Sequence, residues 1–119
     1  MEEQWSIIYW ESTAGEKPIE QFIASVEEST QNKIARTFDL LEEFGIKIGT
    51  SHTKKVADTP FWELRILGSD NIRIFYIAVA GKTFLLLHAF KKKSQKTPHR
   101  EIKIALSRLQ QYQFRQKEF

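Results

Sequence analysis

The sequence predicts one α+β domain with the element order β-α-α-β-β-β-α, in which helices pack on one face of a twisted, mainly antiparallel sheet. First, 119 residues of which 41% are hydrophobic suit a single domain with one core, placed at residues 1–119. Second, apolar residues recur at helical spacing in residues 18–44 and in strand-like runs in residues 61–90. Third, short turn-forming stretches separate those runs, which favours neighbouring antiparallel strands.

The first part of the chain is typical of one strand followed by two helices. Residues 5–10 (WSIIYW) are β-branched and aromatic, as strands often are. Pro18 suits the first turn of a helix, and a stripe of apolar residues follows it at helical spacing. A second helix can be capped by Ser29 or Thr30 and ended by Gly45. Two short amphipathic helices of this kind pack against a flat surface such as a sheet.

The second part of the chain is typical of a loop, three strands and a helix. Residues 45–60 are rich in Gly, Ser, Thr and Pro, which predicts irregular structure. Three apolar or alternating runs follow at residues 61–67, 72–79 and 83–90, and the short turns between them predict an antiparallel meander. A Thr-Pro pair at residues 97–98 can cap and open a last helix.

Charge is divided unevenly along the chain. The first 50 residues hold four Lys and Arg against ten Asp and Glu, whereas residues 51–119 hold fourteen against five. This division predicts an acidic face and a basic face, and the basic face would attract a polyanion. The alternative is a salt-bridged surface on which the two halves neutralise each other.

Cations gather around the predicted meander. Arg65 and Arg73 interrupt the apolar pattern of two adjoining strands, so we expect both on the exposed face of the sheet. The alternative for both arginines is a surface ion pair with Glu63 or Asp70. Further cations precede and follow the meander: Lys54, Lys55, Lys91, Lys92, Lys93, Lys96 and Arg100. This concentration favours phosphate binding, for which the planar, bidentate arginine fork is well suited.

Missing residue types exclude most hydrolase chemistries. The chain has no cysteine, which excludes disulfides, thiolate zinc sites and a cysteine nucleophile. The three histidines share no metal-ligand spacing, and the chain lacks a Gly-rich phosphate loop and a nucleophile turn. We therefore expect no metal and no cofactor. The N-terminus is acidic with a short apolar run, unlike a signal peptide or a membrane span, so we expect a soluble cytoplasmic protein without a membrane partner.

One phosphate chemistry needs neither metal nor cysteine. The 2′-hydroxyl of RNA can attack its adjacent phosphate, which gives a 2′,3′-cyclic phosphate and a free 5′-hydroxyl. Fixed cations stabilise the transition state, a lysine crowded by cations can act as a base, and a tyrosine or histidine can donate a proton or stack on a base. Residues of these types include Tyr76 and His88 beside the arginines and lysines. Core packing is the alternative for both, because Tyr76 has the opposite strand parity to Arg73 and His88 lies in an apolar run.

Three motifs lie along the same region: ELR at residues 63–65, an arginine and a tyrosine at 73 and 76, and LLHAFKKKSQKTPHREIKIA at residues 86–105. In these motifs the chain resembles the RelE/ParE toxin superfamily, in particular its HigB-like, phage-related branch. The resemblance implies a RelE-like fold and the toxin of a type II toxin–antitoxin system. The chain departs from the family pattern at Ala89, where glycine is common.

The resemblance further implies a ribosome-dependent, metal-independent mRNA endonuclease that inhibits translation. Its implied partners are the ribosome, mRNA and a cognate helix-turn-helix antitoxin that neutralises it in a hetero-oligomer. The implied catalytic residues are Arg65, Arg73, His88 and Lys93. The implied RNA-binding residues are Lys54, Lys55, Lys91, Lys92, Lys96 and Tyr76. Two alternatives stay open, namely a ParE-like gyrase inhibitor without catalysis and a plain RNA-binding module.

Overall fold

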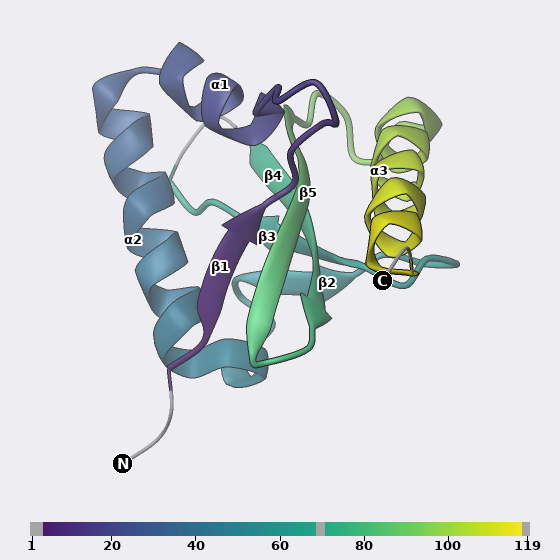
Figure 1. Ribbon diagram of the computed structural model, residues 1–119. Coiled ribbons are helices and arrows are strands. Elements are labelled where there is room, and N and C mark those ends of the chain that lie inside the picture. Colours follow the sequence, from purple (N-terminus) through teal and green to yellow (C-terminus); the bar gives the residue numbers. More distant parts are fainter. Residues whose placement is uncertain (1–3, 69–70, 118–119) are drawn as a thin grey trace.

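The structure, a computed structural model, describes residues 4–68 and 71–117. Within this part the chain is an α+β protein with five strands, three α-helices and one short 3₁₀ helix, η1 (Figure 1). Their bounds are β1 Ser6–Tyr9, α1 Pro18–Ser25, α2 Glu28–Phe44, η1 Gly45–Lys47, β2 Thr53–Lys55, β3 Trp62–Arg65, β4 Ile72–Val79, β5 Thr83–Lys91 and α3 His99–Lys117. The order matches the predicted one, with β2 as an additional strand.

The strands form one mixed sheet in the order β1-β5-β4-β3-β2. Strands β2, β3, β4 and β5 pair antiparallel with one another in that order, as the short turns between β3, β4 and β5 predicted. Strand β1 joins the far edge and pairs in parallel with β5. The longest strand, β5, therefore lies inside the sheet although it comes late in the chain.

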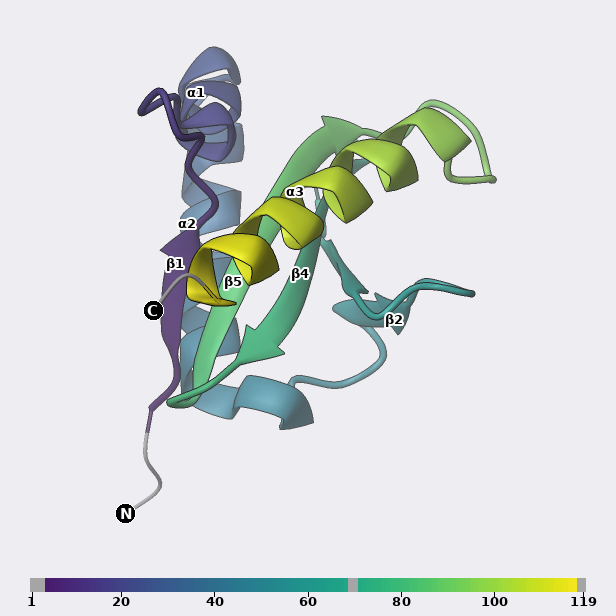
Figure 2. The same cartoon turned by 45° about the vertical axis from the view of Figure 1, so that its right-hand side comes forward.

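Helices cover both faces of the sheet, so the prediction that they pack on one face is wrong. The pair α1 and α2 lies on one side, and α3 crosses the other side over β4 and β5 (Figures 1 and 2). On the first side the rings of Tyr9 and Phe38 lie 6.2 Å apart, which joins β1 to α2. On the second side His88 of β5 forms a hydrogen bond with Glu101 of α3. We call these two sides the α2 face and the α3 face.

A β-bulge lets β5 pack against both helix layers. Two successive residues of β4 pair with His88 and with Leu86, which leaves Leu87 as an extra residue in β5. Because successive residues of β4 face opposite sides, Leu86 and His88 also face opposite sides despite being two positions apart. Every residue of β5 from 84 to 90 is buried, as expected for a strand that is covered on both faces.

The ends of α2 differ in how well the sequence predicts them. Glu27 is the N-cap residue, so Ser29 and Thr30 lie inside the helix and the prediction that one of them caps it is wrong. Gly45 ends the helix as predicted, with a positive φ of 57° that favours glycine. A Cβ atom at Gly45 would also clash with the indole ring of Trp5, so this glycine lets β1 approach the end of α2.

Residues 45–60, which were predicted to be irregular, contain η1 and the short strand β2. Thr53 pairs with Leu64, and the two following residues continue the ladder to β3. The turn after β2 is held by the Thr59 hydroxyl, which donates to the carbonyl of Val56 at 2.9 Å. The Lys55 ammonium also donates to the carbonyl of Thr59. These contacts fix β2 as the outer edge of the sheet, beside the arginines of β3 and β4.

The last helix, α3, extends to Lys117 and so includes most of the C-terminal tail. Its buried residues are Glu101, Ala105 and Leu109, with Ile102 and Leu106 partly buried beside them. The apolar members of this set recur at the spacing of an amphipathic helix, and the structure adds a buried acid to their stripe. Among the helices of residues 4–68 and 71–117, none has the length and apolar character needed to span a bilayer.

Candidate nucleic-acid interface

Two arginines lie side by side on the α3 face. Arg65 of β3 is the direct cross-strand partner of Arg73 of β4, and directly opposed residues point to the same face. Like charges in this position repel each other and weaken the strand pair unless a counter-charge is near. The sequence predicted that both arginines share one face, and the register shows that they are neighbours.

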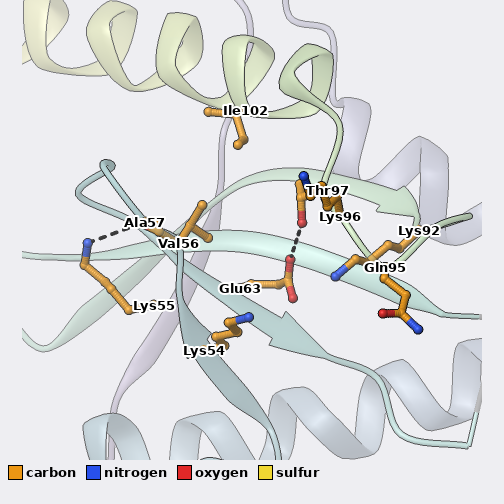
Figure 3. A pocket seen from close by; sticks show the side chains of 10 residues that line it. All are labelled: Lys54, Lys55, Val56, Ala57, Glu63, Lys92, Gln95, Lys96, Thr97 and Ile102. Atoms are coloured by element: carbon orange, nitrogen blue, oxygen red, sulfur yellow. Dashed lines mark hydrogen bonds between the residues drawn. The ribbon is translucent and has the colours of Figure 1, made fainter.

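The counter-charge is the buried carboxylate of Glu63. Its Oε2 lies 3.4 Å from Nε of Arg73, an ion pair without hydrogen-bond geometry, and the glutamate side chain is only 3% exposed. Its Oε1 accepts a 3.2 Å hydrogen bond from the hydroxyl of Thr97 (Figure 3). Glu63 therefore pairs with Arg73, as the ion-pair alternative for Arg73 supposed, although the carboxylate is buried and not at the surface. Asp70, the other partner considered for Arg65, lies outside the described residues.

This carboxylate fixes two elements at once. Arg73 is held by Glu63 on one side and donates from Nη1 to the carbonyl of Ile72 at 3.1 Å. Thr97, predicted as a helix cap, uses its hydroxyl to tie the segment before α3 to the sheet. A buried carboxylate is tolerated where such partners compensate its lost hydration. Glu63 therefore orients Arg73 and anchors the lysine-rich segment that follows β5.

Lysines from two other segments complete a hollow around the arginine pair. Lys54 of β2 is the cross-strand partner of Glu63, and the segment after β5 contributes Lys92 and Lys93. The residues that line this cationic hollow are Lys54, Arg65, Asn71, Arg73, Lys92, Lys93, Ser94 and Gln95. Five of these eight side chains are cationic, and the five come from four separate segments of the chain. Such convergence suits a phosphate, whose oxygens accept several charge-assisted hydrogen bonds.

A second hollow adjoins the first. The two share Lys54, Lys92 and Gln95 on their common rim. Figure 3 shows the second hollow between the β2–β3 edge and the start of α3, with Glu63 and Thr97 inside it. One wall is apolar and is formed by Val56, Ala57 and Ile102. We call it the mixed hollow, because lysines and aliphatic side chains line it together.

The structure brings seven of the ten predicted site residues to the two hollows. The cationic hollow holds Lys54, Arg65, Arg73, Lys92 and Lys93, and the mixed hollow adds Lys55 and Lys96. Lys91 does not join them. It pairs with Ile72, the neighbour of Arg73, and so points to the opposite face of the sheet.

Tyr76, predicted to bind RNA, lies outside both hollows on the α2 face. Its side chain is 4% exposed, and its hydroxyl shares a 2.7 Å hydrogen bond with the hydroxyl of Thr53. Its ring meets Phe84 edge to face at 5.3 Å. Burial raises the pKa of the Tyr76 hydroxyl, and the bond to Thr53 opposes this only in part. The position favours the packing alternative over the predicted role in RNA binding.

His88, predicted to be catalytic, also lies outside both hollows. Its Nε2 lies 2.7 Å from Oε1 of Glu101, and its Nδ1 lies 3.3 Å from Nη1 of Arg108. Because arginine can only donate, Nδ1 accepts and Nε2 carries the proton toward the carboxylate. Desolvation lowers the pKa of His88, while its hydrogen bond to Glu101 raises it and the charge of Arg108 lowers it further. The geometry describes a neutral histidine that joins β5 to α3, in agreement with the core alternative.

The sequence named Glu63 as a possible ion-pair partner but did not indicate its burial or its bond to Thr97, and it gave no role to Glu101 or Arg108. Strand parity could have placed Glu63 on the same face as Arg65, since the two are two positions apart. No comparable signal pairs His88 with two residues of a distant helix. Within the part of the chain that the structure describes, no three His, Asp or Glu side chains gather in a way that could hold a metal ion.

The sequence of residues 21–110 matches the family of phage-derived Gp49-like proteins (DUF891). This range is well over half of the chain and contains every residue of both hollows named above. No curated protein matches the chain at a significant level.

Proposed function

The chain belongs to the phage-derived Gp49-like family, which is associated with RelE-like toxins of toxin–antitoxin systems, and we propose on this premise that it is a HigB-like toxin. Its proposed activity is ribosome-dependent, metal-independent cleavage of mRNA, which stops translation. Its proposed partner is a cognate antitoxin that neutralises it in a hetero-oligomer. The cationic hollow on the α3 face supports this proposal, because it can bind the phosphate at which RNA is cut.

In the proposed reaction the 2′-hydroxyl of a nucleotide attacks the adjacent phosphorus, and the 5′-oxygen of the next nucleotide leaves. Negative charge grows on the phosphate oxygens during this step. Arg73, oriented by Glu63, and its neighbour Arg65 are placed to stabilise that charge from fixed positions. Lys93 is the candidate for proton transfer among the predicted catalytic residues that line the hollow, since His88 is engaged between β5 and α3.

Tyr76 and His88 lie outside both hollows, which favours a second candidate function, a plain RNA-binding module. Both side chains were candidates for moving protons, and both are buried in other contacts. The cationic hollow alone would bind RNA without cutting it, because phosphate contacts give affinity without chemistry. Cleavage and binding must therefore be measured separately.

The decisive experiment maps mRNA 5′ ends in a reconstituted translation reaction, with and without ribosomes. We expect new 5′-hydroxyl ends that require both ribosomes and the intact protein. Arg65→Ala should reduce their yield by about 100- to 1,000-fold, which is typical for loss of one fixed transition-state donor. Arg36→Ala is the matched control, because Arg36 is an exposed arginine on α2, on the other face of the sheet.

Each alternative result points to a different function. RNA binding without new 5′ ends would replace the nuclease with the RNA-binding module. If the folded protein neither binds nor cleaves RNA, the gyrase inhibitor becomes the remaining candidate. A DNA supercoiling assay would then test it. Cleavage that is unchanged by Arg65→Ala would remove the arginine pair from the mechanism.

A further inference from the structure

The two hollows divide their chemistry in the way that a nucleotide does. A nucleotide carries a compact anion at one end and a flat, weakly polar base at the other. The cationic hollow presents Arg65 and Arg73 among lysines, whereas the mixed hollow adds one aliphatic wall to the four lysines that also line it. A second phosphate would gain little from that aliphatic wall, but a base can pack its face on it.

The hollows are close enough to hold parts of one ligand. Glu63 lines the mixed hollow, Arg73 lines the cationic hollow, and the two side chains lie 3.4 Å apart. Lys54 and Lys92 belong to both linings, so no further side chain separates the hollows along this rim. A phosphate bound to Arg73 would therefore place the attached nucleoside at the entrance of the mixed hollow.

The carboxylate of Glu63 favours a base over a second phosphate in the mixed hollow. A negative side chain inside the hollow repels a phosphate at short range. The same side chain tolerates the N–H groups on the edge of a base, and the amide of Gln95 on the rim can donate to or accept from that edge. Thr97 keeps the carboxylate in position through its 3.2 Å hydrogen bond.

From these contacts we propose that the mixed hollow is a nucleobase-binding site for single-stranded RNA whose phosphate lies in the cationic hollow. The base packs against the aliphatic wall to which Val56 and Ala57 contribute from the β2–β3 side and Ile102 from the α3 side. The inference rests on the proposed function and adds that the protein reads one base beside the phosphate that it binds. Base recognition of this kind needs an unpaired nucleotide, because a duplex hides the base in its stack.

The test uses three ligands with one phosphodiester each, added to the full-length protein labelled for NMR. They are a dinucleoside monophosphate and its two analogues that lack either the 5′ or the 3′ base. We expect removal of one of the two bases to weaken binding about tenfold and to abolish the shifts of Ala57 and Ile102. Removal of the other base should change neither the affinity nor the shifts of Ala57 and Ile102. All three ligands should shift the NMR signals of Lys92 and Lys93.

A pair of variants tests the same site from the side of the protein. Ala57→Phe fills the mixed hollow from an exposed turn, and Ala14→Phe adds the same ring to an exposed turn outside both hollows. We expect Ala57→Phe to weaken the dinucleoside monophosphate about tenfold and to leave binding of ribose 5-phosphate unchanged. Ala14→Phe should alter neither.

The outcomes separate this inference from the proposed function. Equal binding of both abasic analogues and the intact dinucleotide, with shifts confined to the cationic hollow, would overturn the base site and leave the phosphate site standing. Absence of shifts in both hollows at low salt, with dinucleotide and with ribose 5-phosphate, would also remove the support for an RNA-directed function.

Discussion

At the scale of single residues, the ion pair between Glu63 and Arg73 links the stability of the sheet to the cationic hollow. Glu63 is almost fully buried, while Arg73 is 17% exposed and can still reach solvent. The two members of the pair therefore differ in how well water can solvate them when the partner is removed. Removal of the arginine isolates a buried charge, which is more costly than freeing a charge that water can solvate.

We expect Arg73→Ala to lower the free energy of unfolding by about 2 kcal/mol, because it removes the ionic partner of a buried carboxylate. Adding Glu63→Gln should recover part of that loss, since a neutral amide is cheaper to bury. Urea denaturation of the wild type, Arg73→Ala and the double variant measures this. Arg65→Ala is the control and should cost less than about 1 kcal/mol. A double variant that is less stable than Arg73→Ala would contradict this account.

Gly45 gives a second prediction at the residue scale. Its φ is 57° and a Cβ atom would meet the indole of Trp5, so Gly45→Ala combines backbone strain with a clash. Gly49 has a φ of 97° and open space around it, so Gly49→Ala brings strain alone. Thermal or urea unfolding should show a loss of about 3 kcal/mol for the first variant and about 1 kcal/mol for the second. Equal losses would show that the contact with Trp5 is unimportant.

At the scale of elements, α3 is attached to the sheet by polar contacts as well as by its apolar stripe. Arg108 donates to the carbonyl of Leu87 at 2.8 Å, and its guanidinium lies 4.9 Å from the ring centre of Trp10. Arg115 approaches the same ring from a position 5.6 Å away. Together with the hydrogen bond between His88 and Glu101, these contacts fix the helix that forms one wall of the mixed hollow.

The hydrogen bonds that join His88 to α3 predict a pH dependence of the free energy of unfolding. The pKa of His88 is lowered from its ordinary value of 6.5, mainly by desolvation, so the unfolded chain takes up this proton at a higher pH than the folded chain. The contribution of His88 is therefore complete above pH 6.5 and is lost as the pH falls below it toward the lowered pKa. Urea denaturation between pH 8 and pH 5 should show this decline, and His88→Gln should flatten it.

The matched control for this experiment is His99→Gln. His99 is an exposed histidine at the start of α3, so its replacement should leave the decline of the wild type unchanged. A decline that persists in His88→Gln would assign the pH dependence to another group.

The element scale also shows which parts of the fold the sequence could predict. Long periodic segments such as α2, β4 and β5 were predictable because their apolar pattern extends over several turns or pleats. The strand β2 was not, since three residues between turn-forming neighbours show no alternation. The face of the sheet that each helix covers was not predictable either, because β5 is buried from residue 84 to residue 90 and its bulge reverses the parity along one apolar run.

The site was predictable where strand register decides it. A short turn between β3 and β4 makes Arg65 and Arg73 neighbours, and parity alone removes Tyr76 from their face. The role of His88 was not predictable, since its partners lie on a helix whose position depends on tertiary packing. Glu63 was considered only as a surface partner, because the sequence does not show that α3 and its preceding segment cover it.

At the scale of the whole molecule, the uneven charge along the sequence becomes a division across the sheet. The acidic first half supplies α1 and α2 on one side, and the cationic hollow lies on the other (Figures 1 and 2). An approaching polyanion is therefore attracted to the α3 face and repelled from the α2 face. This orientation would guide RNA to the hollow before any specific contact forms.

This arrangement predicts a salt-dependent affinity for single-stranded RNA. The slope of log affinity against log salt is negative, and its magnitude should decrease by about 0.7 for each phosphate-binding lysine that is removed. The double variant Lys92→Gln, Lys93→Gln should therefore have a slope whose magnitude is smaller by about 1.4. Lys103→Gln with Lys117→Gln removes the same charge from exposed sites on α3 outside the hollows and should change it much less. Fluorescence anisotropy over a salt series measures both slopes, and equal slopes would argue against the hollow.

The parallel pairing of β1 with β5 has a consequence for how this protein is made. Ile7 is synthesised well before its partner Phe84, which follows 77 residues later in the chain. Thr97 and Glu101, which close the hollow and attach α3, are made later still. A nascent or truncated chain therefore has an unpaired first strand and an open site. If the protein is a toxin, synthesis must therefore pass α3 before the chain can harm the ribosome that makes it.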